Sequence, residues 1–183
     1  MSTTIPNYVA GTWDIDPVHS DVSFVVRHMM VSKVRGRFEG VSGELVTGEE
    51  FENSTVSATI DCSSLTTGNE QRDGHVKSAD FFEVEKYPTW NFTSTGLVAK
   101  GDEYVLSGDL TIKGVTKPVE LELEVNGFGP DAWGGTRAGF TAKTTINRSD
   151  YGVDIELPLD GGGVVVSEKV GVELEIQAVL RAA

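Results

Sequence analysis

Hydrophobic and polar residues alternate with a period of two along most of the chain. Residues 119–125 show this most clearly, because four apolar residues there alternate with three glutamates. In a strand, such a run places the apolar side chains on one face and the carboxylates on the other, whereas a helix would scatter both around its circumference. Runs of this type predict about eight strands, over residues 14–29, 35–46, 54–62, 90–99, 103–112, 117–128, 136–147 and 169–181.

Short connections separate several of the predicted strands. A turn at residues 100–102 and a tight reversal at residues 113–118 each join two strands, which must therefore be antiparallel. About eight antiparallel strands with one apolar face each favour an all-β fold, either a closed barrel or a sandwich. Neither a repeat nor a shift in composition divides the sequence, so residues 1–183 are predicted to form a single domain.

Two regions interrupt the alternation. Within residues 63–87, Thr67 and Glu70 have the spacing of a capping box, and the apolar residues that follow have helical spacing. We expect a short helix there, lying against an opening of the barrel. Residues 148–168 predict a long loop with one irregular turn, of the kind that is often functional.

Charge and composition exclude several classes of function. The chain carries 28 acidic and 15 basic residues, a formal net charge of -13, and such a surface repels nucleic acid and anionic membranes. Its one cysteine, Cys62, cannot form an internal disulfide or a cysteine cluster and is expected to be a small buried residue. The sequence contains neither a signal-peptide pattern nor an apolar stretch of membrane-spanning length, so we expect a cytoplasmic protein without an integral membrane segment.

Residue types that could carry chemistry are dispersed. The three histidines, His19, His28 and His75, do not have the spacing of a metal site. Asp16, His19 and Ser20 are the residue types of a hydrolytic triad, but neighbouring residues of a strand point to opposite faces. We therefore expect neither a metal nor catalytic residues, and we expect Asp16 and Ser20 to bond nearby backbone.

The aromatic residues leave two alternatives open, a packed core or an apolar cavity. Phenylalanines and a tryptophan fall on or beside the predicted strands, which is typical of a core. Many inward candidates are small or β-branched, however, and this favours a cavity, since barrels of this size either fill with side chains or hold one ligand. The residues that leave such space are Val22, Val26, Val56, Ala58, Gly108 and Ala142.

A series of motifs along nearly the whole chain resembles the YceI-like, polyisoprenoid-binding family. The resemblance implies an elongated, lipocalin-like antiparallel barrel whose pore takes a long apolar amphiphile, such as a polyisoprenoid, a quinone tail or a fatty amide. It implies no established enzyme activity and no cofactor beyond the bound lipid. Many members carry a secretion signal, which this sequence lacks. The motifs are Trp13-Asp14-Ile15-Asp16-Pro17-Val18-His19-Ser20, Phe24-Val25-Val26-Arg27-His28, Gly36-Arg37-Phe38, Arg72-Asp73-Gly74-His75, Ser78-Ala79-Asp80-Phe81-Phe82, Gly108-Asp109-Leu110-Thr111-Ile112-Lys113-Gly114-Val115-Thr116-Lys117-Pro118-Val119 and Arg148-Ser149-Asp150-Tyr151-Gly152.

Together, these observations give a set of candidate site residues. At the mouth, Arg72, His75 and His28 are candidates to meet the polar head of the ligand. The alternative is a purely structural role, in which Arg72 and Asp73 pair with each other or with strand ends. The expected function is non-enzymatic carriage, storage or sequestration of the lipid; the alternatives are an enzyme acting on a bound amphiphile and a ligand-free structural or stress protein. Pairing of edge strands into a homodimer stays open. The candidates for the pore lining are Val22, Phe24, Val26, Phe38, Val56, Phe81, Phe82, Phe92, Leu110 and Phe140.

Overall fold

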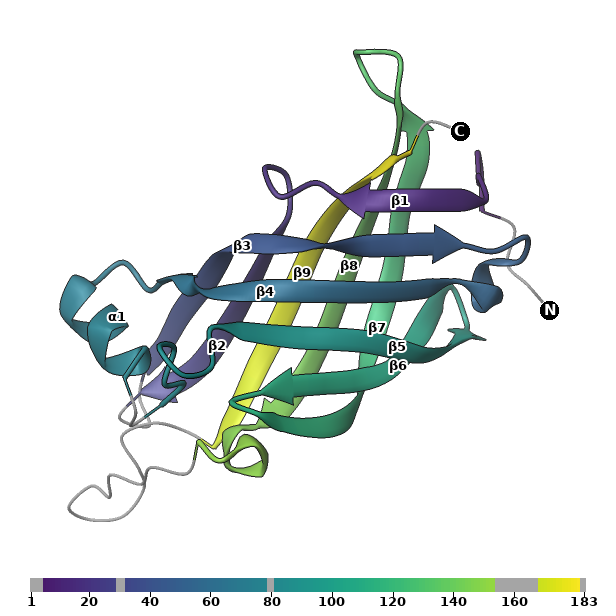
Figure 1. Cartoon of the computed structure of the whole chain (residues 1–183). Helices are drawn as coiled ribbons and strands as arrows, with labels where there is room; N and C mark the ends of the chain where they lie inside the picture. The colour runs from purple at the N-terminus through teal and green to yellow at the C-terminus, as the bar shows by residue number, and fades with distance from the viewer. Residues whose placement is uncertain (1–4, 29–31, 79–80, 154–167, 182–183) are drawn as a thin grey trace.

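The computed structural model describes residues 5–28, 32–78, 81–153 and 168–181. Within these residues, nine strands, one α-helix and two 3₁₀ turns follow one another along the chain (Figure 1). The strands are β1 (Gly11–Ile15), β2 (Asp21–His28), β3 (Ser32–Thr47), β4 (Thr55–Thr66), β5 (Thr89–Lys100), β6 (Glu103–Ile112), β7 (Val115–Pro130), β8 (Thr136–Asn147) and β9 (Lys169–Leu180). The helical elements are η1 (Phe51–Asn53), α1 (Glu70–Val76) and η2 (Arg148–Tyr151).

The strands form one antiparallel sheet that closes on itself. Its order is β1-β3-β2-β9-β8-β7-β6-β5-β4, and the additional pairing of β4 with β3 closes the sheet. Strands β1 and β2 both lie between β3 and β9, so they occupy one position in the wall. The closed eight-position barrel confirms the predicted all-β fold.

The predicted strand over residues 14–29 is wrong in one respect, because it breaks between β1 and β2. The backbone N–H of Val18 donates a hydrogen bond of 2.9 Å to the Asp16 Oδ1 atom, which forms a local turn. Pro17 between them has no N–H to contribute to a ladder. The chain therefore turns for five residues and then rejoins the same position in the sheet.

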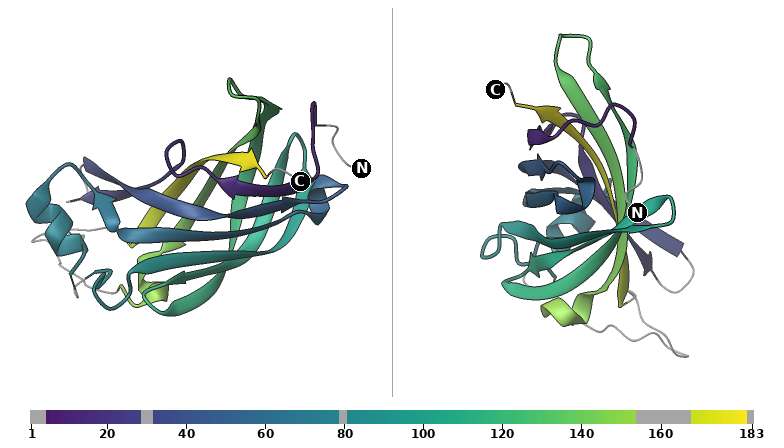
Figure 2. Two further views of the ribbon diagram at one scale, coloured as in Figure 1. Left: turned by 45° about the horizontal axis from the view of Figure 1, so that its top comes forward. Right: turned by 90° about the vertical axis from the view of Figure 1, so that its right-hand side faces the viewer.

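The two ends of the barrel carry different connections. Figures 1 and 2 show α1 at one end, and the chain's N-terminal segment and η1 at the opposite end. We call these the α1 end and the η1 end. At the α1 end, β6 and β7 are joined by Lys113 (φ 52°) and Gly114 (φ 76°), a pair of positive φ values that suits a tight two-residue hairpin turn.

The short helix is confirmed, but its predicted capping box is wrong. The N-cap residue is Asn69, whose side chain accepts a hydrogen bond from the Arg72 N–H. The backbone N–H and hydroxyl of Thr67 instead donate to the Asp73 carboxylate, which ties the preceding loop to the helix. The helix α1 ends at Val76, and residues 79–80 lie outside the described residues.

Inward-facing side chains form two apolar clusters, one toward each end. The α1-end cluster is centred on aromatic residues such as Phe38 and Trp90, and Val76 of α1 packs against it. The η1-end cluster includes Trp13 and Phe128, and Phe51 of η1 belongs to it. Partly buried residues that touch both clusters lie between them: Leu45, Phe92, Val119, Leu174 and Ile176.

Candidate functional site: an apolar cavity inside the barrel

A cavity of about 120 Å³ lies between the two clusters. Of its 23 lining residues, 19 carry aliphatic or aromatic side chains and four carry hydroxyl groups. Thr47 is one of the four, and its Oγ1 atom is already bonded: it donates to the Val9 carbonyl and accepts from the Trp13 Nε1. The lining residues are Ile15, Leu45, Thr47, Phe51, Ser54, Thr55, Val56, Ala58, Ile60, Trp90, Phe92, Leu97, Leu106, Leu110, Val119, Leu121, Leu123, Phe140, Ala142, Thr144, Val172, Leu174 and Ile176.

Four of the ten predicted pore-lining residues line this cavity: Val56, Phe92, Leu110 and Phe140. They come from β4, β5, β6 and β8, where alternation turns every second side chain inward. Whether these four contact a ligand stays a prediction.

The other predicted residues lie outside the cavity wall. Val22, Phe24 and Phe38 face the interior but belong to the tightly packed α1-end cluster, with Phe38 4.7 Å from the ring of Trp90 between centroids. Val26 and Phe82 pack against the same cluster. Phe81 is buried near α1, where its ring meets the edge of His75 at 5.0 Å. Close ring packing therefore fills this end, so these six residues do not line the cavity.

Only some of the small inward-facing residues that were expected to leave space line the cavity. Ala58 and Ala142 do line it. Gly108 does not, because the ring of Phe92 covers it so closely that a Cβ atom there would lie 2.3 Å from the ring. Phe24 covers Gly36 in the same way, also at 2.3 Å. At both of these positions the glycine makes room for a neighbouring ring and does not mark free space.

Sequence reasoning missed the aliphatic part of the wall. The alternating pattern pointed to these residues, but aromatic residues were favoured over aliphatic ones. The missed residues include Leu97, Leu106, Leu121, Leu123, Leu174 and Ile176.

Arg72 and His75, two of the predicted head-group residues, do not line the apolar cavity. Arg72 is exposed, and its guanidinium donates two hydrogen bonds of 2.8 Å to the hydroxyl and carbonyl of Thr67. His75 is exposed on α1 beside Phe81. His28 ends β2, and its side chain lies outside the described part of the chain. Arg72 therefore bonds the residue that directly follows the end of β4, as one form of the structural alternative expected, and its contact with a ligand head stays a prediction.

Asp16, His19 and Ser20 do not form a triad. Ser20 Oγ donates to the Gln177 carbonyl and accepts from the Gln177 N–H, so it joins the strands instead of meeting His19. The Asp16 carboxylate accepts hydrogen bonds of 2.7 Å from both His19 Nδ1 and Arg137 Nη1. The expected backbone bonds of Asp16 and Ser20 are present.

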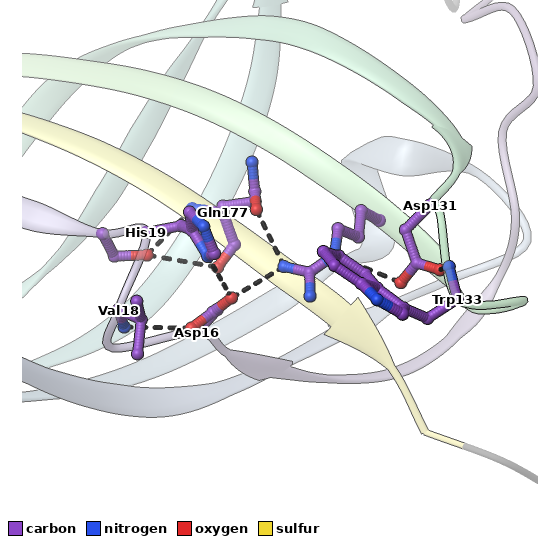
Figure 3. A network of polar contacts seen from close by, with 8 residues as sticks. Asp16, Val18, His19, Asp131, Trp133 and Gln177 are labelled. Atoms are coloured by element: carbon purple, nitrogen blue, oxygen red, sulfur yellow. Dashed lines mark hydrogen bonds and ion pairs between the residues drawn. The ribbon is translucent and has the colours of Figure 1, made fainter.

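The Asp16 contacts extend into a polar network on the outside of the barrel. Arg137 also donates to Gln177 Oε1 and to Asp131, and its guanidinium lies over the ring of Trp133, which is 79% exposed (Figure 3). Burial acts to raise the pKa of Asp16, but the hydrogen bonds from Arg137, His19 and Val18 outweigh it and lower the pKa to about 2. This network joins the turn after β1 to the β7–β8 connection, and we assign it a structural role.

Reactive groups are scarce in and around the cavity. Burial, with a smaller contribution from Asp61, raises the pKa of the Cys62 thiol to about 12, so the thiol is protonated and unreactive at neutral pH. Among the described residues, no three His, Cys, Asp or Glu side chains converge in a way that could hold a metal ion. The same part of the chain has no helix with both the length and the apolar character needed to cross a bilayer.

Comparisons with known proteins agree with this geometry. The family model of the YceI-like domain matches residues 13–178. Protein YceI of Escherichia coli O157:H7 is 40% identical over 152 residues, which cover 81% of this chain and 80% of that protein. Crystalline BcnA of Burkholderia cenocepacia has the same fold, with a TM-score of 0.76 and 24% identity over 89% of this chain and 98% of that one. A polyisoprenoid binding domain from Saccharophagus degradans also shares it, with a TM-score of 0.71 and 20% identity over 92% and 98% of the two chains.

Proposed function

The chain belongs to the YceI-like family, and from this premise we propose that it binds an apolar, chain-like amphiphile in its barrel without converting it chemically. One observation carries the proposal: a closed barrel encloses a cavity whose wall is almost entirely hydrocarbon. The shared fold of a polyisoprenoid binding domain supports a prenyl chain as the ligand class. Quinone tails and fatty amides offer the same apolar surface.

The energetics favour binding of a hydrocarbon chain. Moving hydrocarbon out of water contributes about 0.8 kcal/mol per buried CH₂ group, so one five-carbon unit contributes roughly 4 kcal/mol before ordering costs. The cavity volume of about 120 Å³ is near the roughly 150 Å³ of an engineered apolar cavity that stays dry and binds benzene. The cavity therefore accepts a short segment directly, and a longer chain must displace side chains of the wall.

The wall offers little for catalysis. Its side chains are aliphatic, aromatic or hydroxyl-bearing, and the hydroxyls of Thr47 and Ser54 already hold backbone groups. An acid, a base or an activated nucleophile would have to reach the cavity from elsewhere. We therefore propose carriage, storage or sequestration of the lipid.

Native mass spectrometry of the protein with added farnesol tests the proposal. We expect a one-to-one complex that organic extraction removes. Ala58→Phe, which fills the cavity from β4, should abolish the complex. Thr59→Phe is the matched control, because its hydroxyl bonds Asn91 on the outer surface, and it should bind like the wild type.

An unmodified mass for the wild-type protein after incubation, with Ala58→Phe and wild type indistinguishable, would contradict the proposal. Equal loss of binding in Ala58→Phe and Thr59→Phe would also contradict it, because the outer surface would then matter as much as the cavity.

A further inference from the structure

The apolar cavity reaches the η1 end of the barrel. It is lined there by Thr47, the last residue of β3, and by Thr55, the first residue of β4. Phe51 and Ser54, which belong to the connection between these two strands, line it as well. Toward the α1 end, Trp90 both lines the cavity and belongs to the α1-end cluster, so ring packing closes that direction. A ligand that enters along the barrel axis must therefore pass the β3–β4 connection.

Phe51 covers the cavity at this end with a side chain that no strand holds. Of the 23 lining residues that the structure describes, 21 lie on strands, and Phe51 and Ser54 are the other two. The Phe51 ring is 7% exposed, and its centroid lies 4.7 Å from that of Tyr104 and 6.3 Å from that of Phe140. Displacing a strand residue breaks the backbone ladder of the wall, whereas displacing η1 leaves every ladder intact.

The hydrogen bonds that shape the β3–β4 connection are local. The backbone N–H of Asn53 donates to the Glu50 carbonyl at 3.0 Å. The backbone N–H of Ser54 donates to the Phe51 carbonyl, also at 3.0 Å. The Gly48 N–H donates to the Ser54 Oγ atom at 3.1 Å, which draws the two ends of the connection together. Because these bonds join residues of the connection to one another, they persist when the connection moves as a unit.

Tyr8 of the N-terminal segment holds the β3–β4 connection in place. Its hydroxyl donates a hydrogen bond of 2.5 Å to the Gly48 carbonyl. The edge of its ring meets the Phe51 ring at 6.0 Å and the Phe128 ring at 5.2 Å between centroids. Tyr8 precedes β1, so it is outside the sheet as well. Two segments outside the sheet, held together by a hydrogen bond and a ring contact, therefore cover this end of the cavity.

We propose that Phe51 is the gate of the cavity and sets the chain length that it accepts: the β3–β4 connection moves away from Tyr8, and the chain of the ligand takes the place of the Phe51 ring. The inference rests on the proposed function, since it concerns entry of the same ligand. It names the wall side chain that a long chain displaces, because a cavity of about 120 Å³ holds only a short segment. The chain then packs against Tyr104 and Phe140, so the apolar interior stays filled.

Stopped-flow mixing with farnesol tests the gate, with tryptophan fluorescence as the signal because Trp90 lines the cavity. Phe51→Ala should raise the association rate constant at least about tenfold, since the chain no longer displaces a buried ring. Phe140→Ala removes an equal ring from β8 in the same wall. This variant should change the affinity without raising the association rate, which separates a gate from added cavity volume.

Equilibrium titration with geraniol, farnesol and geranylgeraniol tests the chain-length assignment. Relative to the wild type, Phe51→Ala should gain less than about threefold in affinity for geraniol and at least about tenfold for geranylgeraniol. The reason is that a longer chain needs more of the space that the ring occupies. An equal gain for all three alcohols would overturn this assignment.

Tyr8→Phe tests the gate without changing the cavity wall. It removes the hydroxyl that bonds Gly48 and keeps the ring, so the fold should persist. The association rate of farnesol should rise about fivefold, the size of one net hydrogen bond, because this bond must break before the chain enters. The dissociation rate should change little, since the bond is already broken in the complex. Tyr87→Phe, beside the β6–β7 turn at the α1 end, is the matched control and should keep the wild-type rates.

The outcomes separate the gate from the proposed function. If the wild type binds none of the three alcohols, both are overturned. If farnesol binds but associates no faster with Phe51→Ala and Tyr8→Phe than with the wild type, only the gate is overturned, and the cavity remains the proposed binding site. Faster association with Tyr87→Phe alone would place the entry at the α1 end and would also overturn the gate.

Discussion

The α1 end and the middle of the barrel have the same alternation of inward and outward side chains, but the α1 end is closely packed and the middle contains a cavity. At the α1 end, Phe38 is fully buried and its ring packs against those of Phe24 and Trp90. In the middle, aliphatic residues such as Leu106 and Leu121 and small residues such as Ala142 leave a cavity. The ring of Phe24, seated over Gly36, fills space at the α1 end, whereas alanines leave space open in the middle. Stability and binding are thus expected to depend on different residues of one interior.

The largest difference should appear when side chains are truncated. Phe38→Ala should lower the free energy of unfolding by about 3–5 kcal/mol, since the packed cluster cannot collapse around the lost ring. Leu106→Ala, beside existing space, should cost about 2 kcal/mol, the low end for such a change. Urea denaturation measures both. Equal losses would mean that the middle is as tightly packed as the α1 end.

Replacing an alanine with a larger residue should cost less stability beside the cavity than where the interior is packed. Ala142→Phe extends into the cavity and should change the free energy of unfolding by less than about 1 kcal/mol. Ala138→Phe, on the same strand but 2% exposed and outside the cavity wall, should cost about 1–3 kcal/mol through overpacking. Thermal or urea unfolding of the pair distinguishes them. A larger cost for Ala142→Phe would show that no usable space exists beside it.

The smallest effect on stability is expected from the polar network around Asp16 on the outside of the barrel. This network borders neither the α1-end cluster nor the cavity. Because the folded-state pKa of Asp16, about 2, lies below its usual 3.8, its contribution to stability is present above pH 4 and is lost as the pH falls from about 4 to 2. Because Arg137 is partly exposed to solvent, we expect its ion pair with Asp16 to contribute about 1 kcal/mol to the free energy of unfolding. Asp16→Asn should remove this part of the acid dependence in pH-resolved denaturation and leave farnesol binding unchanged. An unaltered acid slope in the variant would assign that dependence to other carboxylates.

The sequence predicted the barrel well because its wall depends on local alternation and short turns, as in residues 119–125. Residues 16–20 were assigned to a strand because the side-chain turn of Asp16 leaves no mark on the hydrophobic pattern. The sequence predicted only a small part of the cavity wall, four of its 23 residues. Alternation predicts that Phe24 and Leu106 both face inward. Only the strand register shows that the ring of Phe24 lies over Gly36.

The most direct test of chain binding in the cavity is calorimetric titration of the protein with geraniol, farnesol and geranylgeraniol at several temperatures. Burial of hydrocarbon gives a negative heat-capacity change, so we expect this change to become more negative, and the affinity to rise, with each added five-carbon unit. The same affinity for all three alcohols, with a heat-capacity change near zero, would contradict binding of the chain inside the barrel.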